Sequence, residues 1–386
     1  MDPTDASDVV VVGAGLAGLV CAKQLARQGL RVTLLDRKVS LRAAIPTTGI
    51  FVRRTLEDFD LPPDCLGPPI RHVTLYSPSR RKLDVESPRP EFCIGRMGSL
   101  YERYLERCLC AGVQWAPGTY YIGWQPCGNR SEIHVKQEGR SLRLRTQFVV
   151  GADGPRSGVA RDLGLDQNRE WIVGAEEVLR DVPLDGPPRL HCFLDPSLAP
   201  GYLAWFANDG EEAHVGVAGY PAQFHPAAAL ESFRSSLGGL FDLHRTQTVE
   251  RRGGLIPVGG ILPRIAGPHG LLVGDAAGAP SPMTAGGLDP CFRLSHFAAE
   301  VIVRFLDTKD AAALEAYSGA RFRERFVSRL WMRRLLATLH SRWLTEAGFF
   351  ALRLALQPLA WHIFFGRGSF PDTAGVRSFQ PSRSSR

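Results

Sequence analysis

The sequence predicts an α/β protein in three parts: an N-terminal domain with a parallel sheet, a second domain with an antiparallel sheet, and a helical C-terminal region. Three patterns support this prediction. The N-terminus has the order strand, glycine-rich turn, helix, strand. Short alternating segments fill the middle of the chain, and apolar and arginine-rich helical stretches end it. The 386 residues suffice for two or three domains of ordinary size.

The first predicted strand is Val9–Val12, a β-branched run of the kind found in buried parallel strands. The glycine-rich turn Gly13–Gly18 follows it and leads into a helix that Gly29 ends. A second strand, Arg31–Leu35, ends at Asp36. This order of elements is the context in which such a glycine motif binds a dinucleotide.

The glycines of this turn have separate roles in a dinucleotide site. Gly13 permits the tight turn, Gly15 lets the backbone approach a pyrophosphate, and Gly18 allows the helix to pack closely. The phosphates would lie at the positive N-terminus of the helix. Asp36 lies 18 residues beyond Gly18, near the spacing at which a carboxylate accepts hydrogen bonds from ribose hydroxyls. The N-terminal unit is therefore predicted to bind a nucleotide.

The middle of the chain contains segments typical of an antiparallel sheet. Ile70–Glu86 alternates around a turn at Ser77–Ser79, which predicts a hairpin, and Trp171–Tyr220 consists of short segments separated by Pro and Gly. These two regions are predicted to form one antiparallel sheet. The remaining predicted elements are a helix at Gly98–Ala111, strands around Val113–Trp124, Ile133–Val135, Phe148–Val150 and Gly270–Val273, and a long helix that begins near Leu288.

The net charge of +7 is concentrated at one end. From Tyr317 to the C-terminus the chain has 12 arginines and 3 acidic residues, a net charge of +9, so the rest of the chain carries −2. This neutral body argues against a protein that binds nucleic acid. A hydrophobic content of 44% with 22% charged residues is typical of a globular protein, not of a disordered chain or a multi-span membrane protein.

The eight cysteines are predicted to be reduced thiols. The chain has no CxxC pair, and most cysteines stand among apolar residues, so neither a metal site nor a disulfide framework is predicted. The acidic start MDPTDASD lacks the apolar run of a secretory signal. These observations favour a cytoplasmic protein.

Two further motifs resemble those of a known group. VVGADGPRS (Val149–Ser157) resembles the Asp-Gly motif, and LLVGDAAGAPSPMTAGGL (Leu271–Leu288) the Gly-Asp motif, of geranylgeranyl reductases and of flavoprotein monooxygenases related to p-hydroxybenzoate hydroxylase. The resemblance implies FAD in a glutathione-reductase-type Rossmann domain, with Asp275 near the ribityl chain and pyrophosphate, the helix from Leu288 directed at the flavin ring, and Arg96 against the FAD. The predicted cofactor-binding residues are Gly13, Ala14, Gly15, Gly18, Asp36, Arg37, Arg96, Asp153, Gly154, Asp275, Gly286, Gly287 and Leu288.

Within this group, PMTAGGL (Pro282–Leu288) is more similar to the reductase pattern than to the hydroxylase pattern. PGYLAWF (Pro200–Phe206) resembles the reductases' YxWxF substrate motif, with its tryptophan one position late. The cysteine that some archaeal members have in an early loop is absent from Ile45–Gly49. The substrate pocket is predicted at Tyr202, Trp205 and Phe206.

The resemblance thus implies reduction of a C=C bond in a hydrophobic small-molecule substrate by hydride transfer from the flavin. Two alternatives remain: a monooxygenase that hydroxylates or epoxidises its substrate, and a flavin-binding protein without catalytic activity. A second glycine motif for NAD(P)H is missing, so NAD(P)H and a separate reductase both remain as electron donors. Spacing names no proton donor.

The C-terminal region predicts helices with two possible settings. The segment Ala347–Phe365 has about the length of a membrane span, but Arg353 and Pro358 near its middle argue against a crossing. The helices would then lie on an anionic membrane surface or pack as a cap over the protein. Four arginines recur upstream at helical spacing: Arg321, Arg325, Arg329 and Arg333.

These elements give the predicted domain boundaries. The FAD-binding domain comprises residues 1–69, 88–165 and 265–316, and the substrate-binding β-sheet domain residues 70–87 and 166–264. The C-terminal helical region is 317–365, and residues 366–386, rich in Ser, Pro, Arg and Gly, form a flexible tail.

Overall fold

The structure is a computed structural model that describes residues 7–324, 327–338, 341–354 and 357–365. Its N-terminal unit has the predicted order β1 (Ser7–Val12), α1 (Leu16–Arg27), β2 (Val32–Leu35). Strand β1 lies between β2 and β11 (Arg140–Gly151) and is parallel to both. Because its edges and faces are both covered, the residues from Val9 to Val12 are at most 3% exposed. The predicted βαβ unit is confirmed.

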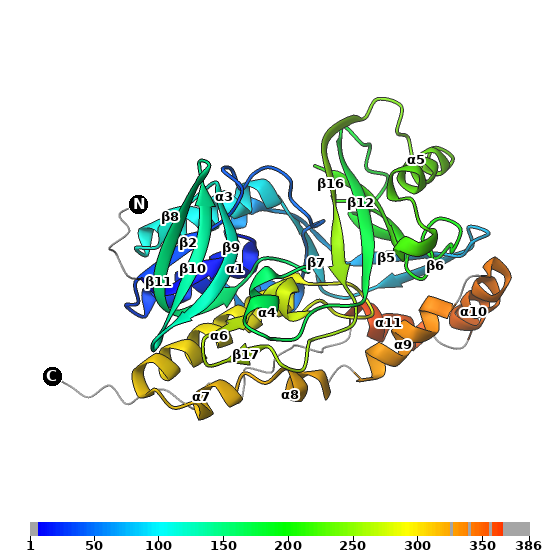
Figure 1. Ribbon diagram of the computed structural model, residues 1–386. Coiled ribbons are helices and arrows are strands. Elements are labelled where there is room, and N and C mark those ends of the chain that lie inside the picture. Colours follow the sequence, from blue (N-terminus) through cyan, green and yellow to red (C-terminus); the bar gives the residue numbers. More distant parts are fainter. Residues whose placement is uncertain (1–6, 325–326, 339–340, 355–356, 366–386) are drawn as a thin grey trace.

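The first sheet extends this unit in the order β17-β18-β11-β1-β2-β8, and β9 and β10 continue it as an antiparallel meander from β11. Helices α3 and α6 both pack against α1, which lies on this sheet (Figure 1). The further elements of this part are β8 (Gln114–Ala116), β9 (Thr119–Cys127), β10 (Arg130–Gln137), β17 (Ala266–Gly267), β18 (Gly270–Leu272), α3 (Met97–Cys110), α4 (Gly158–Asp162) and α6 (Leu288–Thr308).

The second sheet has the strand order β16-β12-β15-β14-β13-β5-β6. Its strands are β5 (His72–Tyr76), β6 (Lys82–Glu86), β12 (Trp171–Arg180), β13 (Arg189–Phe193), β14 (Ala204–Asn208), β15 (Ala213–Gly219) and β16 (Gln247–Pro257). The prediction that the hairpin and the later strands share one sheet is confirmed. The prediction that this sheet is antiparallel throughout is wrong at one junction, where β5 and β13 are parallel. No tight turn joins these two strands, so nothing forces them to run in opposite directions.

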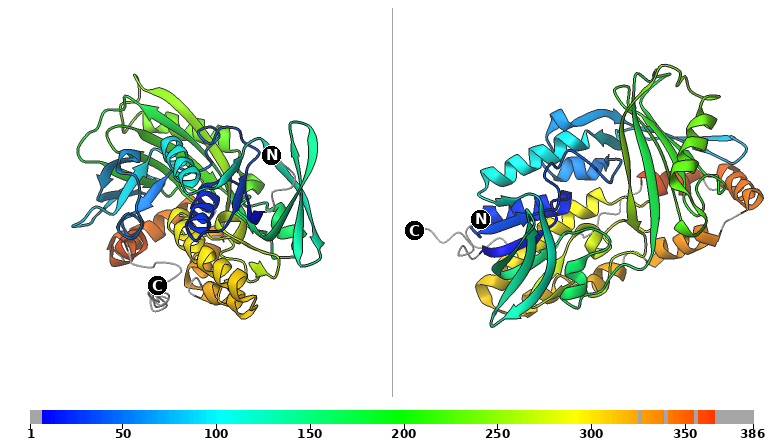
Figure 2. Two further views of the ribbon diagram at one scale, coloured as in Figure 1. Left: turned by 90° about the vertical axis from the view of Figure 1, so that its left-hand side faces the viewer. Right: turned by 45° about the horizontal axis from the view of Figure 1, so that its top comes forward.

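The two faces of the second sheet have different coverings. Helix α5 (Pro226–Leu237) covers one face, where Phe233 packs against Phe193. The opposite face looks toward the first sheet and the C-terminal helices (Figure 2). A small third sheet has the order β3-β7-β4, and helix α2 follows its first strand; the bounds are β3 (Ile50–Val52), β4 (Leu66–Ile70), β7 (Phe92–Gly95) and α2 (Arg53–Asp58).

The C-terminal region is helical, and Figure 1 shows it running from the first sheet to the hairpin β5–β6. Its helices are α7 (Ala312–Glu315), α8 (Gly319–Arg323), α9 (Val327–Thr338), α10 (Arg342–Leu354) and α11 (Gln357–Phe365). Within the described residues, none of these helices alone has the length and apolar character to span a membrane; α10 and α11 pass that test only as a pair bent by 98°. Arg325 and the predicted tail 366–386 lie outside the described residues.

Candidate active site

A cavity of about 1910 Å³ lies between the first sheet, the second sheet and the C-terminal helices. Sites for drug-sized ligands are typically about 300–1,000 Å³, so this cavity has room for a dinucleotide and a second molecule. One end is lined by the predicted cofactor motifs, and the other by the second sheet and helices α9 to α11. Twelve-residue α1 and long α6 both begin at its wall.

The glycine turn is built by close packing on one side and open space on the other. A Cβ at Gly13, where φ is +102°, would stand 2.3 Å from the carbonyl oxygen of Ala152, and one at Gly18 would stand 1.9 Å from that of Gly13. A Cβ at Gly15 would meet nothing within 4 Å, because this residue faces the cavity. Gly15 is also the N-cap of α1 and provides no side-chain cap. The turn therefore fits a pyrophosphate, with unpaired helix-end amides to bind it.

Asp36 and Arg37 line the cavity next to this turn. The carboxylate of Asp36 accepts hydrogen bonds from the backbone N–H of Ala14 at 2.7 Å and of Lys38 at 2.8 Å. It thereby ties the turn to the end of β2, and its remaining lone pairs can accept from ribose hydroxyls.

Asp153 and Gly154 also line the cavity, but the Asp153 carboxylate is already engaged. It accepts from the Ser157 hydroxyl at 2.6 Å and from the N–H groups of Gly158 and Val159 at 2.8 and 3.1 Å. These hydrogen bonds of the Asp153 carboxylate fix the start of α4. Gly154, at φ +85° with no atom near its Cβ position, forms the open part of the turn.

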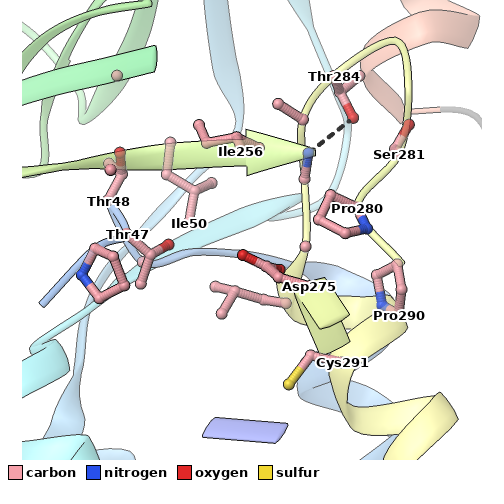
Figure 3. A pocket seen from close by; sticks show the side chains of 18 of the residues that line it. Thr47, Thr48, Ile50, Ile256, Asp275, Pro280, Ser281, Thr284, Pro290 and Cys291 are labelled. Carbon is pink, nitrogen blue, oxygen red and sulfur yellow. Dashed lines mark hydrogen bonds between the residues drawn. The ribbon is translucent and has the colours of Figure 1, made fainter. Parts of the chain in front are cut away.

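Asp275 lies where the cavity meets the start of α6. Figure 3 shows its side chain between Thr47 and Thr48 on one side and the Pro280–Thr284 loop on the other. Burial raises the pKa of Asp275 to about 6. The α6 N-cap, Gly287, offers no side-chain cap, so helix-end amides face the cavity together with Gly286 and Leu288. An electron-rich ring and a hydroxylated chain both fit this combination of positive helix end and hydrogen-bond acceptor.

We expect Asp275→Asn to stabilise the cofactor-free protein above about pH 6. Because the pKa of Asp275 is raised, the folded protein binds more protons than the unfolded chain between pH 3.8 and about 6, and its free energy of unfolding falls as the pH rises through this range. The shift corresponds to at most about 3 kcal/mol. Chemical unfolding of both proteins from about pH 4 to pH 8 checks this; an identical pH dependence would contradict it.

Three predicted site residues do not reach the cavity. Gly18 contributes only the predicted helix packing. The prediction for Arg96 is not supported: its guanidinium pairs with Asp209 at 2.8 Å and Glu211 at 2.6 Å, because the end of β7 turns it toward the loop after β14. The prediction for Phe206 is wrong, since its ring is fully buried on the α5 face of the sheet. Neighbouring residues of a strand face opposite sides, so only Trp205 can point into the cavity.

The other substrate-pocket residues, Tyr202 and Trp205, do line the cavity. The Tyr202 hydroxyl donates to the Thr284 carbonyl oxygen at 2.5 Å, which joins the second sheet to the loop before α6. The indole of Trp205 lies over Gly216, where a Cβ would come within 2.1 Å of the ring. Its N–H donates to the Glu176 carboxylate at 2.9 Å.

The described arginines of the C-terminal set, Arg321, Arg329 and Arg333, differ in their exposure. Arg333 is 2% exposed: its guanidinium lies over the rings of Tyr202 and Tyr220, and Nε donates to the Tyr220 hydroxyl at 3.1 Å. Arg329 lines the cavity, and burial lowers its pKa. Only Arg321 of the described members is an exposed side chain. Two tyrosines next to strands β14 and β15 thus anchor α9.

Sequence reasoning missed several cavity residues. Thr48 and Pro46 come from the loop before β3, and Glu176 and Arg252 from paired positions of β12 and β16. Alternation within β12 and β16 identifies one face of each strand, but it does not show which face is turned to the cavity. The helical lining was also missed; it includes Met332, Leu336, Phe349, Leu352, Ile363 and Phe364.

Comparison with known proteins agrees with this site. Residues 11–68 match the model of an NAD(P)-binding Rossmann-like domain, and residues 125–219 match an FAD binding domain. Digeranylgeranylglycerophospholipid reductase 1 of Methanopyrus kandleri is 30% identical over 332 residues, which cover 83% of this chain and 86% of the relative. The chain belongs to the geranylgeranyl reductase family. It is an FAD-dependent oxidoreductase, as the sequence motifs predict.

Other members of the geranylgeranyl reductase family and its structural relatives extend the similarity over nearly the whole chain. Geranylgeranyl diphosphate reductase of Rhodobacter capsulatus is 27% identical over 80% of this chain and 78% of its own. A geranylgeranyl bacteriochlorophyll reductase-like protein of Thermoplasma acidophilum has the same fold, with a TM-score of 0.82 at 18% identity over 97% of this chain and 99% of its own. The p-nitrophenol 4-monooxygenase PnpA of Pseudomonas putida also shares the fold, with a TM-score of 0.71 at 17% identity over 94% and 99%.

Proposed function

We propose that this chain reduces C=C bonds of a prenyl substrate with reduced FAD. The observation that supports this most directly is the single continuous cavity. Its cofactor end has the glycine turn and two helix N-termini, and its other end is lined by apolar side chains of the second sheet and of α9 to α11. Relatives named for geranylgeranyl and digeranylgeranyl substrates support a long apolar chain as the occupant of that end.

In this proposal Gly13–Gly15, Asp36 and Arg37 hold the adenosine and pyrophosphate part of FAD. Asp275 and Gly286–Leu288 hold its flavin part. FAD supplies the hydride when it is bound and reduced. The chain contributes the walls: Trp205 and Cys192 from the sheet and Phe349 and Leu352 from α10 exclude water from the apolar end. The bond between Tyr202 and the Thr284 carbonyl fixes the loop before α6 against that wall.

The decisive experiment is reoxidation of the purified, chemically reduced holoenzyme. Without oxygen, geranylgeranyl diphosphate or a digeranylgeranyl glycerophospholipid is expected to restore the absorbance of oxidised flavin, with a saturated product detected by mass spectrometry. Prenyl-free glycerophospholipid is the control and should leave the flavin reduced. Reoxidation that requires both oxygen and the alkene, with an oxygenated product, would support the monooxygenase alternative instead.

We also propose that the outer side of the C-terminal helices lies on a membrane surface. Two polar side chains of helix α10 contact the turn of the hairpin β5–β6: Glu346 accepts hydrogen bonds from Ser77 at 2.9 Å and Ser79 at 2.7 Å, and Arg342 donates to the Pro78 carbonyl. Apolar side chains face outward, among them Trp343 and Leu354, which are 74% and 69% exposed. An outward apolar face next to a cavity for a prenyl chain suits docking on lipid.

A further inference from the structure

A buried cluster of charged side chains lies on the cavity face of the second sheet. Its centre is Glu176 on β12, which is 3% exposed and lines the cavity. His214 on β15, fully buried, places Nδ1 3.1 Å from Glu176 Oε1. Arg252 on β16 lies 3.6 Å from the same oxygen and pairs with Glu250 at 2.6 Å. A carboxylate and an imidazole this deep in a sheet are costly unless they are paired and hydrogen-bonded, and here they form such a pair with each other.

The outer side of the cluster leads toward solvent. His214 Nε2 is buried and has no hydrogen-bond partner within the described part of the chain, which is uncommon for a buried ring nitrogen. Glu212 Oε2 lies 3.9 Å from this nitrogen. Glu212 is partly exposed and contacts Arg180 at 3.3 Å and Arg96 at 3.5 Å. A small rotation of Glu212, or one water molecule, would connect Nε2 to solvent.

The inner side of the cluster ends at the cavity. Thr48 Oγ1 donates to Glu176 Oε2 at 2.5 Å, and Figure 3 shows the Thr48 side chain at the cavity wall. Trp205 Nε1 donates to the same oxygen. The row Glu212, His214, Glu176, Thr48 therefore connects the surface to the cavity with two hydrogen bonds and one gap of 3.9 Å.

We propose that this row, called the relay below, delivers the proton that C=C reduction requires. The inference rests on the proposed function, because reduction adds a hydride to one carbon and a proton to the other. The reduced cofactor supplies the hydride. The Thr48 hydroxyl turns from Glu176 toward the cavity and gives its proton to the second carbon. Glu176 then accepts the Nδ1 proton of His214 and passes one proton to the Thr48 oxygen. Solvent then supplies one proton to Nε2 through Glu212, and the imidazole ring turns to present an N–H to Glu176 again, so each turnover consumes one solvent proton.

The charges around Glu176 suit a transient carrier. Burial alone would raise the pKa of Glu176, but the positive charges of His214 and Arg252 and the hydrogen bonds from His214 and Thr48 hold it below its usual range. Glu176 is thus ionised at rest and ready to accept the His214 proton when the cavity consumes one. A merely structural ion pair would need neither the Thr48 bond at the cavity nor an Nε2 without a partner in the described part of the chain, close to the partly exposed Glu212.

The kinetic test compares variants of the reduced holoenzyme that reacts with geranylgeranyl diphosphate without oxygen. Thr48→Val keeps the side-chain shape and removes the hydroxyl, and His214→Gln breaks the middle of the relay; each should slow flavin reoxidation by about 100-fold or more. Thr48→Ser should restore most of the rate. Thr48→Val should also show a larger solvent deuterium isotope effect than the native enzyme. Native rates in Thr48→Val and His214→Gln would overturn the relay.

The matched control is Glu177→Gln. Glu177 is the next residue of β12, is also buried and ion-paired, to Arg234 and Arg251, but faces the other side of the sheet. Its substitution should leave the reoxidation rate unchanged. A slow Glu177→Gln variant would mean that any charge loss on β12 disturbs the sheet, and would overturn the assignment to the relay.

A second readout does not depend on activity. In oxidised His214→Gln, Glu176 loses its nearest charged partner, and an infrared band of a protonated carboxyl group should appear near neutral pH. This band should be absent from the native protein and from the double variant His214→Gln/Glu176→Gln. No band in His214→Gln would show that the two residues share no proton. A native enzyme that reacts with neither prenyl substrate would overturn the proposed function, while the infrared result would still decide the Glu176–His214 exchange.

Discussion

Gly15→Val is expected to yield a folded protein that contains almost no FAD. The Cβ position of Gly15 has no protein atom within 4 Å and φ is −63°, so valine fits the backbone and meets no part of the chain. Its side chain would instead fill the place where the turn approaches the pyrophosphate. Flavin absorbance per chain, together with circular dichroism, measures both effects. We expect loss of the proposed activity in the same variant.

Gly123→Val is the matched control for this loss. Gly123 on β9 also has open space at its Cβ position and no positive φ, but it does not line the cavity. It should retain the FAD content of the native protein. If Gly15→Val instead kept stoichiometric FAD, the glycine turn would not be the pyrophosphate site.

The triple variant Trp343→Ser/Phe350→Ser/Leu354→Ser is expected to bind anionic phospholipid vesicles about 100-fold more weakly than the native protein. These side chains are between 51% and 74% exposed, so each can bury apolar area in the lipid interface. At about 25 cal/mol per Å² the three together contribute roughly 3 kcal/mol, and 1.4 kcal/mol is a factor of ten. Sedimentation with vesicles at low and high salt measures the change.

Ile122→Ser serves as its control, since Ile122 is 50% exposed on β9, away from the C-terminal helices. It should not alter vesicle binding. High salt should weaken the electrostatic part of binding, to which exposed arginines such as Arg321 and Arg353 contribute. Absence of vesicle binding by the native protein at low salt would contradict the membrane proposal and leave α9 to α11 as a cap over the cavity.

Sequence predicts best what is local. The order strand, glycine turn, helix and strand from Val9 to Leu35 depends on a few consecutive residues, and it is confirmed with small differences at the boundaries. The sequence also predicts the hairpin and the later strands, because apolar and polar residues alternate over only a few positions in a strand. It does not predict the parallel pairing of β5 and β13, because this pairing joins segments more than a hundred residues apart and no turn constrains it.

Side-chain direction explains the errors at the site. The sequence predicts Tyr202, Trp205 and Phe206 in one pocket because they are neighbours along the chain, whereas a strand turns adjacent residues such as Trp205 and Phe206 to opposite faces. The sequence predicts Arg96 against the FAD and Arg333 in a row of arginines at helical spacing, but distant segments provide their partners: carboxylates for Arg96 and tyrosine rings for Arg333. Such partners depend on pairings across the whole chain, which a local pattern does not contain.

The glycine beneath the indole ring gives the cavity wall an unusual sensitivity to sequence. A single methyl group at Gly216 would stand 2.1 Å from the Trp205 ring and force it to lift off the sheet. The lifted ring would narrow the space for the proposed prenyl substrate and lose its bond to Glu176. A small substitution on an interior strand usually changes only the stability of the protein. At position 216, one added carbon atom would also change which lengths and branching patterns of the proposed prenyl substrate fit the cavity. Position 216 is therefore where we would look first when the substrate ranges of natural or evolved variants are compared.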